Sequence, residues 1–398
     1  MAVVPSTAER AFSGMVTFMS STAIVTELAS RYDLDRPTAE ILAAHNFDPE
    51  QFDELRGRLA ANGADPTRNH VTGALEVPAD NDLVTFPASG SNRYVELTKL
   101  GETAIGAGQV GVVLLAGGMA TRFGGGVKAL AEVLPGLRFV DVKIADLQNL
   151  GERLDVRIPM VLMSSYLSDG VLADVAEQLS TDRVAVETAP QNVAMRVTPS
   201  GDLFHAESGS VSVYSPGHGD LGDAIRNSGF LDRFLSAGGK YLFVTNVDNS
   251  AATLDPAMVG LHLDSGRPLT CEVVSSDAPG GAPYILDGHL QILEAFRVPP
   301  DSGLTSVPVV NTNSLTVDAE QLTNAHPLTW FEVSKSVDGV PVMQFERLVG
   351  ELSAFMDTTM TLVVSGGVDG RFQPVKDPTE LADRQSMIRE ILEYRGLL

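Results

Sequence analysis

Two cationic side chains lie within a glycine-rich segment that directly follows an apolar run. Residues 112–136 read VVLLAGGMATRFGGGVKALAEVLPG: two glycines, then Arg122, then three more glycines and Lys128. Glycines allow backbone N–H groups to approach oxyanions closely, and the two cations add charge-assisted hydrogen bonds. The segment matches neither the P-loop nor the GxGxxG pattern. Its chemistry nevertheless favours a polyphosphate ligand over a flexible turn with solvated cations.

Oxygen-bearing side chains end a second apolar run. The segment FVTNVDNSA, residues 243–251, places Asn246, Asp248 and Asn249 at the end of a predicted strand. Carboxylates and other hard oxygen groups are the ligands that Mg²⁺ takes in proteins, so Asp248 is a candidate metal ligand. An aspartate that caps the next turn is the alternative, and the segment leaves both interpretations open.

Three further segments contain residues that suit ligand binding. In SPGHGDLGDAI, His218 lies between two glycines and Asp220 directly precedes a helix, where an aspartate is commonly an N-cap. In VVNTNSLTV, Asn311 and Asn313 share one face of a strand; asparagine is disfavoured there, so the pair suggests hydrogen bonds to a polyhydroxylated ligand. The segment GRFQPVKD brings Lys376 to the start of the last predicted helix.

Alternating strands and helices must position these residues. Apolar runs of strand length predict strands at 110–117, 158–165, 184–189, 241–249 and 269–276. Amphipathic patterns predict helices at 168–180 and 221–239. Asp-Gly pairs between strand-like runs predict hairpins at 284–293 and 335–345. This alternation predicts a three-layer α/β core with a mostly parallel sheet, whose ligands bind at the carboxyl ends of the strands.

The two ends of the chain differ from this core. Residues 1–60 carry apolar residues at helical spacing, and residues 64–95 are polar and rich in turn formers, as in a linker or a small β element. A last helix is predicted from Pro378, with Asp377 as its N-cap and Glu380 at the capping-box position.

Composition restricts the class of protein. The formal net charge is −23 and the pI about 4.6, which argues against a surface that coats nucleic acid. A length of 398 residues suggests roughly two to three domains. The single cysteine, Cys271, excludes an intrachain disulfide and fits a reducing compartment. Glu9, Arg10 and Glu27 lie too close to the apolar N-terminal residues for a membrane span, so a cytoplasmic protein is expected.

Taken in order, these segments resemble those of the UDP-sugar pyrophosphorylases. This family includes UTP–glucose-1-phosphate uridylyltransferase and the N-acetylhexosamine-1-phosphate enzymes. The resemblance covers about residues 100–377 and is carried by LAGGMATRFGGGVK, PQNVAMRV, PGHGD, FVTNVDN, GGAPYILDGHLQILE, NTN, QFE and RFQPVK. Each motif alone is weak, but their number and order argue against a chance match.

The resemblance implies a fold and a division of the chain. The implied core is a three-layer α/β/α nucleotide-diphospho-sugar transferase fold, glycosyltransferase-A-like and Rossmann-like, with a mixed, mostly parallel sheet. The expected parts are an N-terminal helical region and linker at 1–100, a catalytic nucleotidyltransferase domain at 101–376 and a C-terminal helix at 377–398. Larger eukaryotic members carry a C-terminal β-helix; the sequence stops about 20 residues past Lys376, so none is expected.

The resemblance also implies roles for single residues, matched position by position. Arg122 and Lys128 would hold the triphosphate and Lys376 would hold the phosphates from the opposite side, which makes these three the expected catalytic residues. Asp248 would hold Mg²⁺. The nucleotide would be bound by Leu115, Ala116, Gly117, Gly118, Gln191, Gly219 and Asp220. The sugar would be bound by His218, Asn246, Gly281, Glu294, Asn311 and Asn313.

Within these sets, Gln191 would read the uracil edge and Gly219 would pack against the base. The implied activity is Mg²⁺-dependent transfer of a nucleotidyl group from a nucleoside triphosphate, most readily UTP, to a sugar 1-phosphate, most readily glucose 1-phosphate, with release of pyrophosphate. No nucleic acid or membrane partner is expected, and the oligomeric state, monomer or dimer, is left open.

Two departures from the family pattern leave alternatives. Ala120 stands where the family has glycine and Val127 where it has proline, and the segment after Gln191 lacks an expected lysine and proline. One alternative is the same chemistry with GTP or another nucleotide and a cyclitol or amino-sugar phosphate in secondary metabolism. The other is a non-catalytic protein that binds sugar nucleotides.

Overall fold

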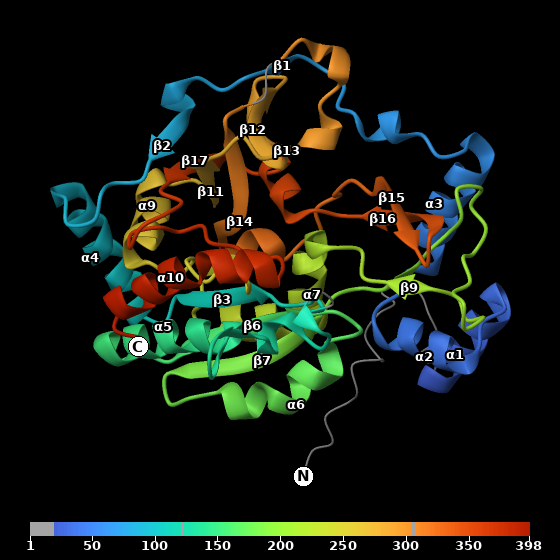
Figure 1. Cartoon of the computed structure of the whole chain (residues 1–398), viewed down its shortest axis with the longest axis horizontal. Helices are drawn as coiled ribbons and strands as arrows, with labels where there is room; N and C mark the ends of the chain where they lie inside the picture. Colours follow the sequence, from blue (N-terminus) through green and yellow to red (C-terminus); the bar gives the residue numbers. More distant parts are fainter. Residues whose placement is uncertain (1–19, 121–122, 305–306) are drawn as a thin grey trace.

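An eight-stranded sheet forms the centre of the chain (Figure 1). The computed structural model describes residues 20–120, 123–304 and 307–398. In order across the sheet, the strands are β2 (Leu83–Thr85), β17 (Thr358–Val363), β11 (Leu269–Ser275), β14 (Val309–Asp318), β10 (Tyr241–Asn246), β3 (Val110–Leu115), β6 (Ile158–Ser164) and β7 (Val184–Pro190). β14 runs antiparallel to both neighbours, and the other pairings in this sheet are parallel. The predicted mixed, mostly parallel sheet is confirmed.

Helices cover both faces of this sheet and complete the three layers. All six residues of β3 are buried, and its side chains alternate: Val112 and Leu114 enter one apolar core, Val113 and Leu115 the other. The first core is closed by α4 (Asn92–Gly106), α5 (Phe139–Leu154), α6 (Asp169–Leu179), α9 (Pro256–Ser265) and α10 (Pro378–Tyr394). The second is closed by α7 (Leu221–Asn227) and α8 (Phe230–Ser236).

The segment 221–239, predicted as one helix, forms two. α7 ends at Asn227, and Gly229 takes a left-handed conformation, with φ +70°, before α8 begins at Phe230. The Phe230 N–H then donates to Ser228 Oγ at 3.3 Å. Glycine adopts this conformation at little cost, whereas the apolar periodicity that suggested one helix continues across the break. The prediction of a single helix was wrong for that reason.

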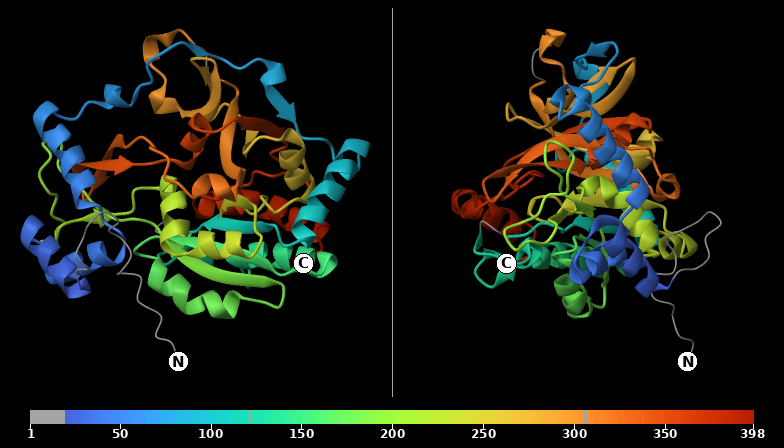
Figure 2. Two further views of the ribbon diagram at one scale, coloured as in Figure 1. Left: turned by 180° about the vertical axis from the view of Figure 1, so that it is seen from behind. Right: turned by 90° about the vertical axis from the view of Figure 1, so that its right-hand side faces the viewer.

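The three N-terminal helices pack beside the sheet rather than on it. α1 (Ser21–Tyr32), α2 (Arg36–Ala44) and α3 (Pro49–Asn62) begin after Ser20, Asp35 and Asp48, whose side chains accept hydrogen bonds from the first turns. Their apolar residues form a separate core with β8 (Ala194–Met195), β9 (Val213–Tyr214) and β16 (Val340–Glu346). Figure 2 shows these helices at one end of the molecule.

The elements that follow these helices join the core. β1 (Leu75–Glu76) pairs with β12 (Gly281–Leu286), β2 forms one edge of the large sheet, and α4 packs along α9. A side chain on Gly101 of α4 would begin 1.8 Å from the Pro256 carbonyl oxygen, so the two helices are in backbone contact. α4 therefore runs through residue 100, where the sequence suggested a division, and belongs with the sheet.

Both predicted hairpins form at their Asp-Gly pairs. β12 (Gly281–Leu286) and β13 (His289–Glu294) join through Asp287 and Gly288. β15 (Phe331–Val337) and β16 join through Asp338 and Gly339. All four turn residues have positive φ, as a two-residue hairpin turn of this kind requires.

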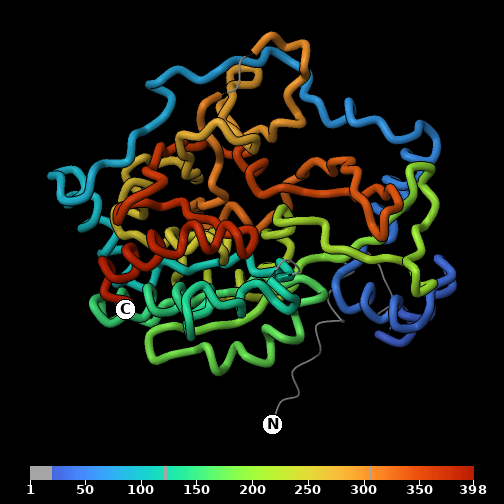
Figure 3. The backbone as a smooth tube through the Cα atoms, in the orientation of Figure 1, coloured from blue at the N-terminus to red at the C-terminus, as the bar shows by residue number. Residues whose placement is uncertain are grey.

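The last helix, α10, begins with the predicted cap. Asp377 accepts hydrogen bonds from the N–H groups of Thr379 and Glu380. Ile388 and Leu392 then pack in the same core as β3 and α5, and Figure 3 shows the helix, in red, in that region. None of the described helices is long and apolar enough to cross a bilayer.

Candidate active site

The predicted site residues gather at the carboxyl ends of β3 and β10. These strands are parallel neighbours, and their ladder ends with Asn246 beside Leu115. From β3 the chain continues to β6 and β7 on one side, and it later returns to β10 on the other. Connections that diverge in this way open a crevice at the carboxyl ends of the strands, where open α/β sheets bind their ligands.

The glycine-rich segment after β3 folds back on itself. The Ala120 N–H donates to the Gly126 carbonyl at 2.8 Å, and the Lys128 N–H donates to the Gly118 carbonyl at 3.1 Å. Ala120 and Val127, the two residues of this segment that depart from the family pattern, are 2% and 5% exposed. They fill the inner side of this small hairpin, while its backbone still delivers Lys128 to the edge of the sheet.

The tip of the hairpin consists of three glycines. Gly124, Gly125 and Gly126 have φ values of +89°, +107° and +81°, a region in which residues with side chains are strained. No atom of the described residues lies within 4 Å of the points where their side chains would begin. Arg122, the second predicted phosphate ligand of this segment, lies outside the described residues, and its role stays a prediction.

Lys128 and Asp248 form an ion pair at this edge. The Lys128 ammonium donates to Asp248 Oδ2, and 15% and 18% of the two side chains are exposed. Asp248 lies in the turn after β10, and its carbonyl accepts a hydrogen bond from the Val375 N–H at 3.2 Å. The cation predicted to hold phosphates thus meets the predicted metal ligand, and both reach solvent.

Lys376 comes to the same place from the C-terminal segment. Residues 373–376 run alongside Asp248 and Asn249, and Asn249 Oδ1 accepts from the Gln373 N–H at 2.8 Å. The Lys376 N–H donates to Glu380 Oε2 at 2.8 Å, which fixes its backbone against the first turn of α10. Within the described part of the chain its ammonium has no ion-pair partner. Three predicted charged residues therefore converge.

The other side of the crevice is formed after β6 and β7. The Ala116 N–H donates to the Met163 carbonyl and the Gln191 N–H to the Ser164 carbonyl, each at 2.9 Å. Gln191 is 7% exposed, and a side chain on Gly117 would begin 2.5 Å from its Nε2. The predicted nucleotide residues Ala116, Gly117 and Gln191 are therefore neighbours, and a side chain at position 117 would displace the Gln191 amide. That Gln191 reads a base stays a prediction.

Asp220 is fully buried and holds Arg347. Its carboxylate accepts from Arg347 Nε at 3.0 Å and from the Asn192 N–H at 3.1 Å. Arg347 also reaches Asp223 at 2.7 Å and lies 4.4 Å from the centre of the Trp330 ring. Burial raises the pKa of Asp220 to about 6, although Arg347 opposes the rise. A carboxylate enclosed in this way positions the backbone at Asn192, so its predicted part in nucleotide binding would be indirect.

Gly219 and His218 lie against residues 347–349. The Gly219 N–H donates to the Arg347 carbonyl at 2.9 Å, and a side chain on Gly219 would begin 2.5 Å from that carbonyl carbon. His218 Nδ1 accepts from the Val349 N–H at 2.9 Å, which leaves the ring neutral with its proton on Nε2. Part of the residue reaches solvent, yet enclosure of the ring lowers its pKa to about 4. Among the described residues Nε2 has no partner, so it is free to donate to a ligand.

The asparagines predicted to bind sugar meet where β10 and β14 pair. The antiparallel ladder ends with Val244 opposite Leu315, and just beyond it Thr245 Oγ1 and Ser314 Oγ lie 2.8 Å apart. Asn311 Nδ2 donates to Asn313 Oδ1 at 3.0 Å. Asn313 has φ +57°, which asparagine tolerates better than most residues. Asn246 is the last residue of β10, so all three asparagines lie near the end of this ladder.

Gly281 and Glu294 form the far side of this region. They are paired across the β12–β13 hairpin, and a side chain on Gly281 would begin 2.8 Å from Glu294 Oε1. Burial raises the pKa of Glu294. Gly350 connects the hairpin to the asparagines, because the point where its side chain would begin lies 3.0 Å from Ile292 Cγ2 and 3.3 Å from Asn311 Nδ2.

Two charged residues of this region were not selected from the sequence. Arg347 directly follows the QFE motif, and only the fold shows that it bridges two aspartates. Lys143 is 3% exposed on α5, between Phe139 and Leu147 on the buried side of that helix. Lys143 lies four residues from Phe139 and four from Leu147, on the apolar face of the helix. This spacing is the signal that could have indicated a buried charge.

The described residues suit a metal ion that takes few protein ligands and binds mainly phosphate oxygens and water. Among them, no three His, Cys, Asp or Glu side chains are grouped so that they could hold a metal ion. Mg²⁺ commonly takes one or two protein carboxylates and completes its shell with phosphate oxygens and water. Asp248, beside the predicted phosphate ligand Lys128, fits that mode of binding.

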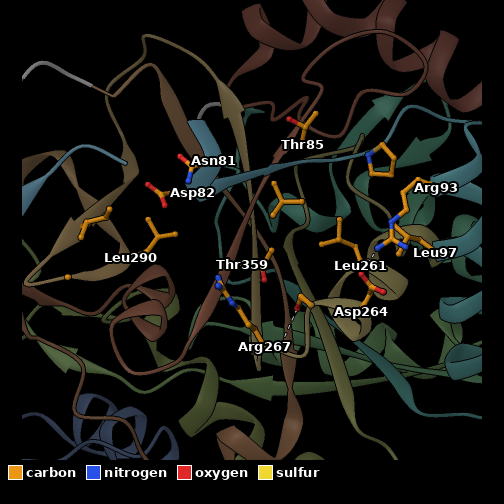
Figure 4. A pocket seen from close by; sticks show the side chains of 15 residues that line it. Asn81, Asp82, Thr85, Arg93, Leu97, Leu261, Asp264, Arg267, Leu290 and Thr359 are labelled. Atoms are coloured by element: carbon orange, nitrogen blue, oxygen red, sulfur yellow. Dashed lines mark hydrogen bonds and ion pairs between the residues drawn. The ribbon is translucent and has the colours of Figure 1, made fainter. Parts of the chain in front are cut away.

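A cavity of about 500 Å³ lies at the opposite edge of the sheet (Figure 4). Part of its wall is formed by Asp264 near the end of α9, by Arg267 in the turn between α9 and β11, and by Thr359 at the start of β17. Arg267 and Thr359 lie at the amino ends of β11 and β17, and none of the predicted site residues lines the cavity. It is therefore separate from the candidate active site.

Comparison with protein families agrees with this geometry. The family described as UTP–glucose-1-phosphate uridylyltransferase matches residues 79–391. The chain belongs to the UTP–glucose-1-phosphate uridylyltransferase family. The matched range begins at β2 and ends within α10, so it contains the whole large sheet and all of the predicted site residues.

Individual members of the UTP–glucose-1-phosphate uridylyltransferase family are moderately similar. The protein of that name from Hordeum vulgare is 29% identical over 300 residues, 71% of this chain and 63% of its own length. That from Solanum tuberosum is 30% identical over 332 residues, 78% of this chain and 68% of its own length. The chain spans about three fifths of the length of the first curated relatives.

A solved structure confirms the expected fold. The uridine diphosphate N-acetylglucosamine pyrophosphorylase from Trypanosoma brucei, in complex with inhibitor, has a TM-score of 0.70 to this chain at 16% identity. The alignment covers 93% of this chain and 85% of that one. The predicted three-layer core is thus that of the sugar-nucleotide pyrophosphorylases.

Proposed function

We propose that this chain transfers a uridylyl group from UTP to a sugar 1-phosphate, with glucose 1-phosphate as the favoured acceptor, and releases pyrophosphate. The observation that carries the proposal is the convergence of Lys128, Asp248 and Lys376 at the carboxyl ends of β3 and β10. Two cations and one carboxylate suit a reaction in which several phosphate charges are brought together. Relatives of the same family are named for this reaction.

The proposed reaction requires positioned substrates and neutralised phosphate charges, and it requires no proton transfer by a side chain. An oxygen of the sugar phosphate attacks the α-phosphorus of UTP, and the bond from that phosphorus to the pyrophosphate oxygen breaks. The bonding electrons leave with the pyrophosphate, so neither a general base nor a covalent intermediate is needed. Orientation and electrostatic stabilisation then supply most of the rate enhancement.

Lys128 and Asp248 are already neutralised by each other before substrates bind. A triphosphate in the crevice would take over the hydrogen bonds of the Lys128 ammonium, which frees the Asp248 carboxylate for a divalent cation. Lys128 would exchange the carboxylate for phosphate, and Asp248 would exchange the ammonium for the divalent cation. Neither group is then left as an unpaired, partly buried charge. Lys128 then stabilises the charge that develops on pyrophosphate, and Lys376 holds the attacking phosphate.

Asp248 is the residue proposed to hold Mg²⁺. When bound, Mg²⁺ would supply charge neutralisation at phosphate oxygens. Arg122 belongs to the proposal on the sequence alone. In the described part of the chain, Lys128 is the cation in contact with Asp248, and Lys376 would complete that role.

The amides of the crevice are proposed to select the two substrates. Gln191 offers both a donor and an acceptor, as the edge of uracil does. Asn246, Asn311 and Asn313 would hydrogen-bond to sugar hydroxyls, and His218 Nε2 would donate to the sugar phosphate. Discrimination among similar sugars then depends on a few hydrogen bonds.

A substrate panel tests the proposal. UTP, GTP, ATP and CTP are crossed with glucose 1-phosphate, N-acetylglucosamine 1-phosphate and a cyclitol phosphate, and pyrophosphate release is followed together with the mass of the product. UTP with glucose 1-phosphate is expected to give the highest kcat/KM. A higher value with GTP or a cyclitol phosphate would replace this specificity with the alternative. Binding of UDP-glucose in calorimetry, with no release from any pair, would indicate a non-catalytic binding protein.

A further inference from the structure

A buried lysine on α5 points at the turn that carries Asp248. The Lys143 ammonium donates to the carbonyl of Asn249, at 2.5 Å, and to the carbonyl of Ala252. Only 3% of Lys143 is exposed, so these hydrogen bonds are made away from water. A buried ammonium needs such partners, and a turn with inward-facing carbonyls needs donors.

Two arginines donate to the same turn from the C-terminal part of the chain. Arg395, at the end of α10, donates to the Ala251 carbonyl at 2.8 Å. Arg371 donates to the Thr253 carbonyl at 3.1 Å. Together with Lys143, three cations from three segments therefore hold the carbonyls of the turn at 249–253.

The two arginines have carboxylate partners, whereas Lys143 has none among the described residues. Arg371 is paired with both oxygens of Glu272, each at 2.6 Å, and Arg395 is paired with Asp146 at 3.3 Å. Lys143 has no carboxylate within ion-pair distance among the described residues, so its hydrogen bonds go to the turn alone. Burial lowers the pKa of Lys143 to about 7, and Asp146 opposes this shift.

The turn in question connects two parts of the candidate active site. Asp248 directly precedes Asn249, whose carbonyl is held by Lys143. The Asn249 side chain in turn accepts from the Gln373 N–H at 2.8 Å and donates to the Arg371 carbonyl at 3.0 Å, in the segment that leads to Lys376. Whatever fixes Asn249 therefore fixes both charged residues relative to each other.

We propose that Lys143 is a positioning residue, which holds the turn at 249–253 and thereby sets the place of Asp248 and Lys376. Its effect on the rate rests on the proposed function, whereas its effect on the rigidity of the turn does not. Lys143→Met keeps most of the side-chain volume but removes the charge and all donors. Lys143→Arg keeps a cation with several donors and serves as the rescue variant.

Two measurements on the full chain separate positioning from folding. Hydrogen exchange of the unliganded protein, in peptides covering 246–254, reports the turn through the N–H groups of Asn249 and Ala252, which close it. Steady-state kinetics with UTP and glucose 1-phosphate report the site. Leu150→Ala, two turns further along α5 at a buried position, is the control for general loss of stability.

Lys143→Met is expected to exchange at least about tenfold faster in this turn and to lower kcat at least about tenfold, with a much smaller change in KM for UTP. Lys143→Arg should recover part of both effects, and Leu150→Ala should show neither. Unchanged exchange in Lys143→Met, or faster exchange with an unchanged kcat, would overturn the proposal. If the wild type releases no pyrophosphate while hydrogen exchange is still faster in Lys143→Met, the proposed function is wrong, but Lys143 still stabilises the turn.

Should Lys143→Met not fold, Lys143→Gln takes its place. It keeps an uncharged donor that is shorter than the lysine and cannot reach both carbonyls as the ammonium does. The same two readouts apply to it, with the same expected directions. Wild-type exchange and kcat in Lys143→Gln would also overturn the proposal.

Discussion

At the scale of single residues, the candidate site depends on a small number of charges. The chain has 28 basic and 51 acidic residues, so anionic substrates approach a body of the same sign. Lys128 and Lys376 supply local positive charge at one edge of the sheet, and Asp248 offsets part of it until substrates bind. The electrostatics of the site are therefore set by side chains that distant segments bring together.

Lys128→Met and Lys376→Met are each expected to lower kcat by a factor on the order of 10², the scale of losing one preorganised electrostatic contact. Methionine keeps the length of the side chain, so packing changes little. Lys240→Met, at an exposed lysine away from the site, is the matched control and should stay close to the wild-type rate. Rates like the wild type in both site variants would contradict the assignment.

His218 makes folding sensitive to mild acid. Its pKa is about 4 in the folded chain and about 6.5 when unfolded, so the neutral ring stabilises the fold fully above pH 6.5. As pH falls, the unfolded state binds the proton first. Between pH 7.5 and 5 the free energy of unfolding should fall by about 2 kcal/mol more in the wild type than in His218→Asn.

Asparagine keeps an acceptor near the position of Nδ1, so the hydrogen bond from the Val349 N–H can persist in this variant. Urea unfolding at several pH values measures the difference. Parallel pH profiles for the wild type and His218→Asn would show that the His218 ring is not held neutral in the fold.

At the scale of elements, the glycine-rich hairpin shows how a changed sequence can keep a family's geometry. Val127 lies between two backbone hydrogen bonds made by its neighbours, and its own N–H takes no part in them. Its φ of −85° is close to the range of proline. The valine thus packs inward while Lys128 keeps its place.

Val127→Pro, which restores the residue of the family pattern, should therefore be tolerated. A proline at a compatible position reduces the entropy of the unfolded chain, so the free energy of unfolding is expected to be unchanged or to rise by up to about 1 kcal/mol, with kcat within a few-fold of the wild type. Val127→Ala, which loses packing without this gain, should be less stable than Val127→Pro in urea unfolding. A tenfold loss of kcat in Val127→Pro would contradict the described hairpin.

The contact of α4 with α9 ties the segment that follows the N-terminal helices to the sheet. Gly101→Ala would place a methyl group 1.8 Å from the Pro256 carbonyl oxygen, and backbone cannot move aside without separating the helices. The free energy of unfolding should fall by about 3 kcal/mol or more.

Gly57→Ala in α3 is the matched control for this prediction. Nothing lies within 4 Å of the new methyl group there, so helix propensity alone should make the variant up to about 1 kcal/mol more stable. Urea unfolding compares the two. Equal stability of Gly101→Ala and the wild type would mean that α4 and α9 are not in close contact.

At the scale of the whole molecule, local signals were predictable and tertiary ones were not. The continuous apolar run of β3, the Asp-Gly hairpins and the cap at Asp377 could be read from sequence because each depends on neighbouring residues. The break at Gly229 could not, since the apolar periodicity runs through it. Lys143 was missed because its partners lie more than a hundred residues away along the chain.

In the candidate site, too, some features were predictable from the sequence and others depend on tertiary packing. The resemblance to the family implied that Lys128, Asp248 and Lys376 would serve one site, and the fold brings their segments together. The enclosure of Asp220 by Arg347 was not predictable, because it depends on how residues 347–349 pack against the PGHGD segment. Sequence indicates which residues take part, and packing decides which of them can touch a ligand.

Whether this crevice joins UTP to a sugar 1-phosphate is measured by the pyrophosphate released from UTP with and without glucose 1-phosphate. We expect release only when both substrates are present, with one UDP-glucose formed for each pyrophosphate. Release that does not depend on the sugar phosphate, or no release although both substrates bind, would contradict it.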